Sequence, residues 1–177
     1  MDCVLTLDIG SSSVRALLFG IDGREVAGFG SHIPYRVSTT EAGGWEIGAA
    51  ELTQIVVQAL DPLCAQMRVQ KMRPAAVAID TFWHSILGVA ADGKAVTPVL
   101  HPFDSRSAAP AKKLALRIDN ARQHNRTGCV LHPSYPPVKL LWLSETQPKA
   151  FHAAKGWLSF GEYLFLDLFG AADAQLL

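Results

Sequence analysis

The stretch Val4-Leu5-Thr6-Leu7-Asp8-Ile9-Gly10-Ser11-Ser12-Ser13-Val14-Arg15 decides the fold of this chain. Residues 4–7 are a short apolar run, which predicts a buried strand ending near Asp8. Apolar character resumes at Val14 and continues to Phe19, which predicts a second strand. Gly10 and three serines lie between the two runs. The segment is therefore expected to form a strand, a polar turn and a returning strand, with a carboxylate at the end of the first strand.

This turn carries the residue types of a phosphate-binding site. Gly10 permits a tight turn and a close approach of the backbone to a ligand. The serines at 11–13 and their amides could face a phosphate, because turn amides form an anion-binding concavity. Asp8 could hold Mg²⁺ through water, and Arg15 adds a positive charge nearby. The alternative from these residues alone is a plain hairpin with a polar turn capped by Asp8.

The rest of the chain predicts an α/β fold. Asp22-Gly23 is a hairpin signal that leads into a third strand, so the first three strands form a meander. Apolar residues at spacings of three and four predict a helix from Leu52 to Leu63, in which Pro62 can cause a kink. Further strands are expected at 75–79, 85–90, 95–100 and 156–159, and further helices at 104–120, from Pro136, and at 162–169. This order places helices on a sheet that starts with an antiparallel meander.

Composition excludes several classes of protein. The 177 residues carry 16 basic and 16 acidic side chains, 49% hydrophobic residues and 18% charged residues. That is enough apolar material for a core and too little charge for a disordered chain. Zero formal net charge gives no electrostatic reason to expect nucleic acid or an anionic membrane as a partner.

Cysteine usage and the first residues favour a cytoplasmic protein. Cys3, Cys64 and Cys129 are scattered and form no Cys-x-x-Cys pair, which speaks against a disulfide framework or a zinc knuckle. No apolar run approaches the roughly 20 residues needed to span a bilayer. Residues 1–4 lack the basic and long apolar regions of a signal peptide. The sequence also lacks a P-loop and a Gly-x-Ser-x-Gly elbow, and its histidines have no metal-ligand spacing.

The segment Leu7-Asp8-Ile9-Gly10-Ser11-Ser12-Ser13-Val14-Arg15-Ala16 resembles the first phosphate motif of the FGGY carbohydrate kinases. That family shares the ribonuclease H-like fold of actin and hexokinase. Later segments resemble the family in its own order, namely Gly44-Trp45-Glu46-Ile47, Asp80-Thr81-Phe82-Trp83-His84-Ser85, Asp92-Gly93-Lys94, Asp104-Ser105-Arg106, Thr127-Gly128 and Lys139-Leu140-Leu141-Trp142-Leu143. Their order along nearly the whole chain makes the resemblance specific.

The resemblance implies ATP-dependent phosphorylation of a small-molecule sugar or polyol, with ATP and Mg²⁺ as cofactors. It implies that Asp8 is the catalytic and metal-binding carboxylate, and that the nucleotide phosphates are lined by Gly10, Ser11, Ser12, Ser13 and Arg15. Trp83 and His84 match the pair that touches the sugar, and Asp104 matches a residue near it. The alternatives are core packing for Trp83, an ordinary hydrogen bond at a strand end for His84, and an N-cap of the following helix for Asp104.

The chain also departs from the family pattern. Pro102 stands where the family has a tryptophan, and Ser134, beside Tyr135, stands where glycerol kinases have a substrate-contacting tyrosine. The family's catalytic base, adenosine pocket and FGGY signature lie further along than Leu177. Residues 1–177 are therefore expected to form the N-terminal sugar- and phosphate-binding domain of a truncated kinase, without the C-terminal nucleotide-binding domain and inactive alone. The surface toward the missing part is expected to be apolar and to favour self-association.

Two other functions stay open at this point. A non-catalytic sugar- or phosphate-binding module of the same fold would tolerate the loss of Asp8. An assembly protein of the actin type would leave the Trp83-His84 and Asp104-Ser105-Arg106 segments without a role. The intact Asp8 and its serines favour the kinase. The sugar itself stays open, with a gluconate-like or pentose substrate as the working guess.

Overall fold

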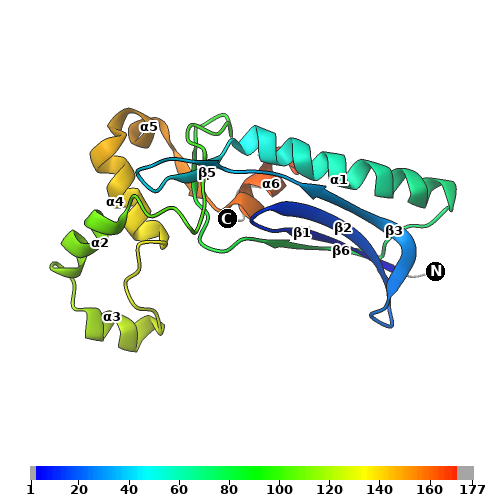
Figure 1. The fold of residues 1–177 in the computed structure, drawn as a ribbon, viewed down its shortest axis with the longest axis horizontal. Helices are drawn as coiled ribbons and strands as arrows, with labels where there is room; N and C mark the ends of the chain where they lie inside the picture. Colours follow the sequence, from blue (N-terminus) through cyan, green and yellow to red (C-terminus); the bar gives the residue numbers. More distant parts are fainter. Residues whose placement is uncertain (1–2, 171–177) are drawn as a thin grey trace. The chain divides into compact units, whose positions relative to one another are not determined.

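The computed structural model describes residues 3–170, which divide into two compact units. One unit contains residues 3–37 and 49–82, and the other contains residues 38–48 and 83–170. Figure 1 shows the elements of both units coloured along the chain. Each unit is described by itself.

The first unit is built on a four-stranded mixed sheet with the strand order β3-β2-β1-β6. β1 (Cys3–Ile9), β2 (Ser13–Gly20) and β3 (Glu25–Pro34) are joined by hairpins and pair in antiparallel fashion. β6 (Ala76–Thr81) pairs with β1 in parallel. The predicted meander is therefore confirmed, and so is the predicted mixed sheet of an α/β fold.

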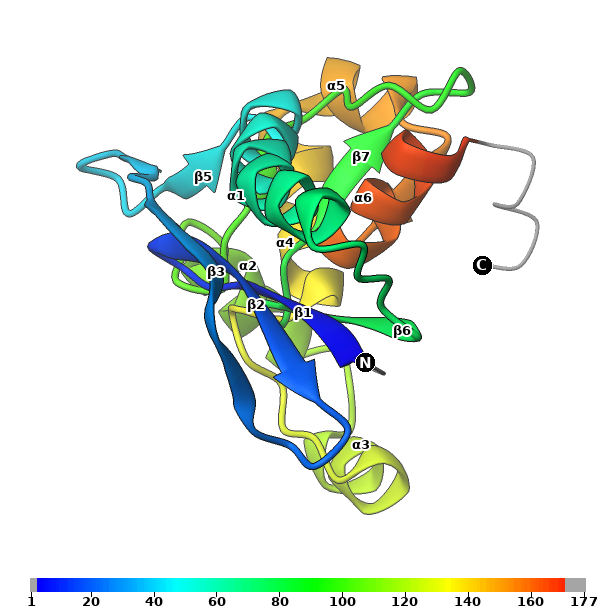
Figure 2. The ribbon, with the colours of Figure 1, turned by 90° about the vertical axis from the view of Figure 1, so that its right-hand side faces the viewer.

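The helix α1 (Ala49–Val69) covers one face of this sheet and packs on β2 and β3 (Figures 1 and 2). Its buried residues recur at helical spacing, from Leu52 and Val56 to Leu63. They meet the buried side of β1 and β2, where the apolar residues alternate with exposed or half-buried ones. Pro62 lies inside the helix without dividing it.

The strand β6 stays exposed although it carries apolar residues. Val77 and Ile79 are 56% and 47% exposed, whereas their partners in register, Leu5 and Leu7, are buried. The reason is local, because α1 packs over β2 and β3 instead of over β6. Exposed apolar residues on a strand favour association with another surface. Self-association of the chain stays a prediction.

The second unit contains two small sheets and five helices. One sheet joins β4 (Ser38–Thr39), β5 (Trp45–Ile47) and β8 (Val99–Leu100), and the other pairs β7 (Leu87–Val89) with β9 (Gly156–Leu158). The helices are α2 (Ala108–Ala115), α3 (Asn120–Thr127), α4 (Pro136–Thr146), α5 (Pro148–Ala153) and α6 (Phe160–Phe169). Ile86, Leu100, Trp142 and Leu143 form a buried core cluster.

Three expectations about these elements were wrong in detail. The single helix expected at 104–120 is shorter and ends at Ala115, and a second helix, α3, begins at Asn120. The Asp119 side chain caps α3 by accepting a hydrogen bond from the Arg122 amide, a signal that the apolar pattern does not contain. The strand expected at 95–100 is reduced to β8 and an isolated bridge at Ala95. The short helix α5 was not predicted.

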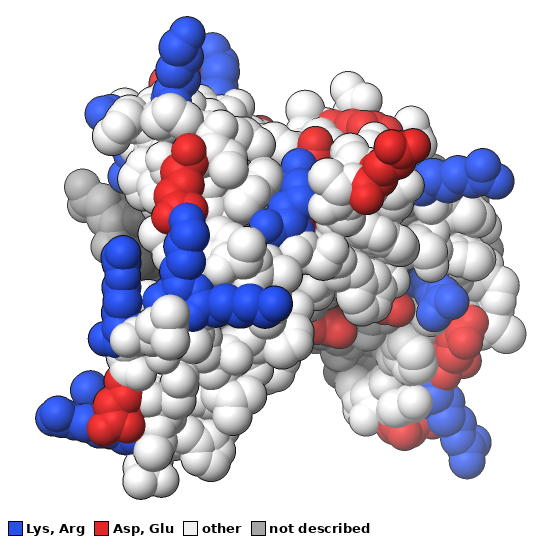
Figure 3. Space-filling model, turned by 60° about the vertical axis from the view of Figure 1, so that its left-hand side comes forward, with Lys and Arg blue, Asp and Glu red and all other residues white. Residues whose placement is uncertain are grey.

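The surface shows no dominant charge. On the face drawn in Figure 3, basic and acidic side chains are interspersed and much of the surface is uncharged. Within residues 3–170, no helix has the length and apolar character that a membrane span requires.

Candidate functional site

Asp8 ends up at the carboxyl end of β1, an interior strand of the first unit, with its side chain exposed. It faces Arg15 across the β1–β2 hairpin, and Arg15 Nη1 lies 3.6 Å from Asp8 Oδ2. Both side chains are about half exposed, at 51% for Asp8 and 53% for Arg15. An ion pair this open contributes little to stability, so both charges remain accessible to a ligand.

The turn after Asp8 is closed by its own backbone. The Gly10 amide donates a hydrogen bond to the Ser13 carbonyl at 2.9 Å. Ser11, Ser12 and Ser13 are exposed or half-buried at the tip of the hairpin. The predicted strand–turn–strand is therefore confirmed as a structure, and its role in binding phosphate stays a prediction.

Tyr35 holds this turn from the end of β3. Its hydroxyl donates to the Gly10 carbonyl, and its amide donates to the Ser12 carbonyl at 2.9 Å. Burial raises the pKa of Tyr35 to about 12, so the hydroxyl stays a donor at any physiological pH. Local sequence patterns do not predict this contact, because it depends on Pro34 pairing with Ser13 across β2 and β3.

Gly10 leaves space beside the Asp8 carboxylate. A Cβ at this position would lie 4.0 Å from Asp8 Oδ1 and 3.4 Å from the Ser13 carbonyl oxygen. Gly10 is not one of the glycines with positive φ. Both distances are ordinary van der Waals contacts, so neither crowding nor a left-handed backbone conformation requires a glycine at this position.

Asp80 is a second carboxylate that sequence analysis did not single out. In the parallel pairing of β1 with β6, Asp8 lies in register with Asp80, so both side chains project from the same face of the sheet. Mg²⁺ in phosphate-transfer sites is held by one or two carboxylates together with waters and phosphate oxygens. Residues 3–170 contain no group of three or more His, Cys, Asp or Glu that could hold a metal. Asp8 and Asp80 together provide the one or two carboxylates that a Mg²⁺ site of this kind needs.

Trp83 and His84 belong to the second unit and follow directly after β6 in the chain. Trp83 is 82% exposed, which rules out core packing as its role. The His84 ring lies 5.4 Å from the Trp83 ring and 4.5 Å from the Tyr135 ring, between their centroids. His84 has φ +60°, a left-handed backbone conformation that is uncommon outside glycine. These rings form an open aromatic platform.

The His84 imidazole favours its neutral form. Desolvation lowers its pKa most, and the charges of Lys139 and His132 lower the pKa further. A neutral imidazole has one donor and one acceptor nitrogen, which suits a hydroxyl of a sugar. His132, whose ring lies 5.7 Å from that of Tyr135, was not predicted as part of this cluster.

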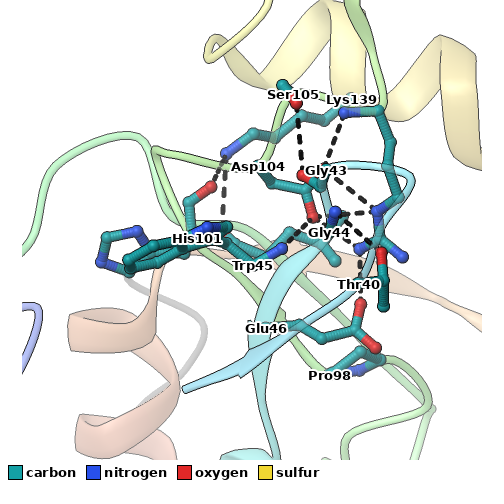
Figure 4. Close-up of polar contacts among 12 residues, drawn as sticks. Thr40, Gly43, Gly44, Trp45, Glu46, Pro98, His101, Asp104, Ser105 and Lys139 are labelled. Atoms are coloured by element: carbon teal, nitrogen blue, oxygen red, sulfur yellow. Dashed lines mark hydrogen bonds and ion pairs between the residues drawn. The ribbon is translucent and has the colours of Figure 1, made fainter. Parts of the chain in front are cut away.

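Asp104 is only 3% exposed, and both its carboxylate oxygens are used inside the second unit (Figure 4). Oδ2 accepts from the Trp45 amide at 3.1 Å, and Arg106 Nε donates to Oδ1 and Oδ2 at 3.1 and 3.0 Å. Asp104 is not the N-cap of α2, because that position is Ser107. Its direct contact with a sugar stays a prediction, while its role in fixing Arg106 and the 43–46 loop is visible.

Arg106 is the centre of this buried network. Its Nη2 forms ion pairs with both Asp104 and Glu46, and its guanidinium carbon lies 4.4 Å from the centroid of the Trp142 ring. The side chain is 13% exposed. Burial lowers the pKa of Arg106, but the hydrogen bonds that Arg106 donates to Asp104 and Glu46, together with the negative charges of these two residues, raise it above its ordinary value. The sequence indicated Asp104-Ser105-Arg106 as a motif but not the pairing with Glu46.

His101 completes the turn that leads to Asp104. It is 1% exposed, and its Nδ1 accepts a hydrogen bond from the Phe103 amide at 3.2 Å. Burial, followed by the charge of Lys139, lowers the pKa of His101 to about 4. Nδ1 must be unprotonated to accept this bond, so the turn requires a neutral imidazole.

The structure thus distributes the predicted site residues over both units. The predicted phosphate-binding residues, Asp8, Gly10, Ser11, Ser12, Ser13 and Arg15, lie in the first unit. The predicted sugar-binding residues, Trp83, His84 and Asp104, lie in the second. In the second unit, Trp83 and His84 lie in the aromatic platform and Asp104 lies in the buried network around Arg106.

The N-terminal domain of the FGGY family of carbohydrate kinases matches residues 3–175. The chain belongs to this family.

Curated relatives include gluconokinase of Bacillus subtilis, 26% identical over 166 residues, and erythritol kinase of Brucella abortus, 24% identical over 169 residues. These matches cover 94% and 96% of this chain but only 32% of either relative. The chain therefore spans about a third of the length of the curated relatives it matches.

Solved structures show the same fold. Gluconate kinase from Lactobacillus acidophilus matches with a TM-score of 0.81 and 23% identity, over 93% of this chain and 32% of that one. Xylulose kinase from Rhodospirillum rubrum matches with a TM-score of 0.86 and 21% identity, over 93% of this chain and 33% of that one.

Proposed function

We propose that this chain is the N-terminal part of an ATP-dependent kinase that phosphorylates a hydroxyl of a sugar, sugar acid or polyol. The observation that carries the proposal is the accessible Asp8 carboxylate at the end of β1, beside Gly10 and the serine turn. Phosphoryl transfer depends mainly on positioning and electrostatic stabilisation, and this turn offers both.

On the phosphate side, Asp8 and Asp80 would hold Mg²⁺, and Arg15 with the serine turn would bind phosphate oxygens. The ion, when bound, supplies positive charge that neutralises the phosphates. Asp8 keeps its carboxylate accessible because its only ion pair, within the described residues, is the loose one with Arg15. Tyr35 orients the turn without using either charge.

On the sugar side, Trp83 would provide a flat apolar wall and His84 a hydrogen-bonding partner for a hydroxyl. The buried Asp104–Arg106 network would keep the neighbouring loop in place. The substrate class comes from relatives named for gluconate, erythritol and xylulose, so a polyhydroxylated chain with or without a carboxylate fits best. The free cysteines at 3, 64 and 129 fit a cytoplasmic enzyme.

We expect no useful turnover from residues 1–177 alone, because the family resemblance places the general base and the adenosine pocket beyond them. A positioned general base contributes about 10²–10⁴-fold to a rate. A coupled assay of ADP release on a panel of sugars, sugar acids and polyols tests this expectation. Robust turnover by this chain would disprove it.

Binding of MgATP through its phosphates tests the role of Asp8 without requiring turnover or the adenosine pocket. Asp8→Asn removes the carboxylate, and Asp22→Asn is a matched control, because Asp22 is also an exposed aspartate paired with an arginine, Arg24, in a hairpin. Calorimetric titration should show binding that is lost in D8N and kept in D22N. Equal binding by both variants would contradict the assignment.

Sugar binding is tested by thermal shift with D-gluconate, D-xylulose and glycerol. His84→Ala and Trp83→Ala should abolish the shift, whereas His152→Ala, at an exposed position on α5, should keep it. If the chain binds sugar in this assay, does not bind MgATP, and binds sugar equally well in D8N, it would instead be a non-catalytic binding module.

A further inference from the structure

Lys139 is the largest fully buried charged side chain in the described part of the molecule. It lies in the first turns of α4 and is 1% exposed. Its Nζ donates to the carbonyl of His101 at 2.9 Å and to the carbonyl of His84 at 3.0 Å, with the Leu100 carbonyl at 3.5 Å. A side chain from one helix thus joins two distant backbone segments.

One of these segments is held in an unfavourable conformation. His84 has φ +60°, a region that a residue with a Cβ adopts only where its surroundings impose it. The carbonyl of the same residue accepts the Lys139 hydrogen bond. The next residue is also fixed, because the Ser85 hydroxyl accepts from the Phe160 amide at 3.1 Å.

The other segment carries the buried acid of the second unit. The His101 carbonyl that binds Lys139 also accepts from the Asp104 amide at 3.0 Å, and the His101 amide donates to the Trp45 carbonyl at 2.9 Å. Trp45 in turn donates to Asp104 Oδ2. A continuous chain of hydrogen bonds therefore runs from the His84 carbonyl through Lys139, His101 and Trp45 to the Asp104 carboxylate.

Apolar packing alone does not explain a lysine at this buried position of α4. Burying an ammonium group carries a desolvation penalty that a methionine of similar length would avoid. The ammonium supplies three donors from one point, which is what three converging carbonyl groups require. The Lys139 ammonium group therefore holds the two backbone segments together through their carbonyl groups.

We infer that Lys139 is a positioning residue for the sugar site, whose ammonium group holds His84 in its left-handed conformation and fixes the imidazole relative to the His101–Asp104 turn. This inference rests on the proposed sugar-binding function of His84. It assigns a role to Lys139 although Lys139 itself touches no ligand.

The first test compares Lys139→Met with Lys113→Met in the full 177-residue chain. Lys113 is an exposed lysine paired with Glu145, so it controls for the loss of a charge. The backbone Cα chemical shift and the amide–Hα coupling of residue 84 report its φ directly by NMR. K139M should move both values away from the left-handed range, and K113M should leave them unchanged. An unchanged His84 in a folded K139M would overturn the inference.

The second test measures the dissociation constant for D-gluconate, D-xylulose and glycerol. K139M should weaken binding of whichever probe the wild type binds by about tenfold or more, because a misplaced contact group loses most of its benefit. Equal weakening in K113M would overturn the inference. If the wild type binds none of the three, the result counts against the proposed function. The NMR signals of His84 in K139M and K113M then test the role of Lys139 without any sugar.

Lys139→Gln keeps a neutral amide group with two N–H donors, and it replaces K139M in both tests if K139M does not fold. In K139Q, the His84 signals should lie between those of the wild type and the extended range. A folded K139Q with wild-type His84 signals and wild-type affinity would overturn the inference equally.

Discussion

Two aspartate–arginine pairs, one in each unit, are built in opposite ways. Asp8 and Arg15 lie 3.6 Å apart and are each about half exposed. Asp104 and Arg106 share several hydrogen bonds and are 2% and 13% exposed as side chains. The first pair leaves its charges available to a ligand, and the second uses its charges to hold the protein together. The same residue types are therefore a site in one unit and a scaffold in the other.

The two pairs differ in exposure because their contacts come from different parts of the chain. Asp8 and Arg15 meet across one hairpin, and that hairpin has an open face at its tip. Arg106 meets Glu46 and the face of Trp142, which come from distant parts of the chain and enclose it. Enclosure lowers the local dielectric, so each interaction there is stronger and each unpaired charge is more costly.

The largest effect is expected from breaking the buried pair. Arg106→Met leaves the Asp104 carboxylate buried without its partner, which should destabilise the second unit by about 3–5 kcal/mol. Urea unfolding followed by tryptophan fluorescence measures this unit selectively, because Trp45, Trp83, Trp142 and Trp157 all lie in it. A loss below about 1 kcal/mol would show that the pair contributes no more than an exposed one.

Acid should weaken the same unit through His101. The pKa of His101 is lowered from 6.5 to about 4, so between these values the unfolded chain binds more protons than the folded one. Stability is then lost as pH falls from about 6.5 to about 4, by about 3 kcal/mol in total. His101→Asn keeps an acceptor for the Phe103 amide but does not titrate, so the difference between wild type and H101N isolates this contribution. Parallel pH profiles for both proteins would contradict it.

A smaller effect is expected from the tyrosine that holds the phosphate turn. Tyr35→Phe removes the hydrogen bond to the Gly10 carbonyl, which should cost the first unit about 1 kcal/mol. Hydrogen exchange of the β1 and β2 amides measures this unit, which contains no tryptophan. If the amides of the second unit lose protection equally, the effect is not local to the turn.

The smallest effect on stability is expected at Arg15. Arg15→Met breaks an exposed ion pair and should change the stability of the first unit by no more than about 1 kcal/mol. In the same variant, MgATP binding should weaken at least tenfold if the guanidinium contacts phosphate, since charge-assisted hydrogen bonds contribute about 1.5–3 kcal/mol. A variant that loses stability but keeps MgATP affinity would reverse the contrast between the two pairs.

Sequence reasoning succeeded where the determinants are local. The apolar runs, the Asp22-Gly23 turn and the polar tip predicted the meander, and the family motif added the fold. Local patterns could not reveal that Arg106 pairs with Glu46, 60 residues earlier, or that Lys139 reaches the His84 carbonyl, 55 residues earlier. The Tyr35 anchor and the register of Asp80 with Asp8 likewise depend on strand pairing. The long-range contact of Asp104 with the Trp45 amide and its pairing with Arg106 give Asp104 a buried structural role that the motif alone did not reveal.

Trp83 is by far the most exposed of the four tryptophans. It is 82% exposed, whereas Trp142 is only 9% exposed and Trp45 and Trp157 are half-buried. A collisional quencher such as iodide reaches an indole in proportion to its contact with solvent. Most of the quenchable emission of the native chain should therefore come from Trp83. A sugar that stacks on that indole would shield it, so protection from quenching would report ligand occupancy without a label and without turnover.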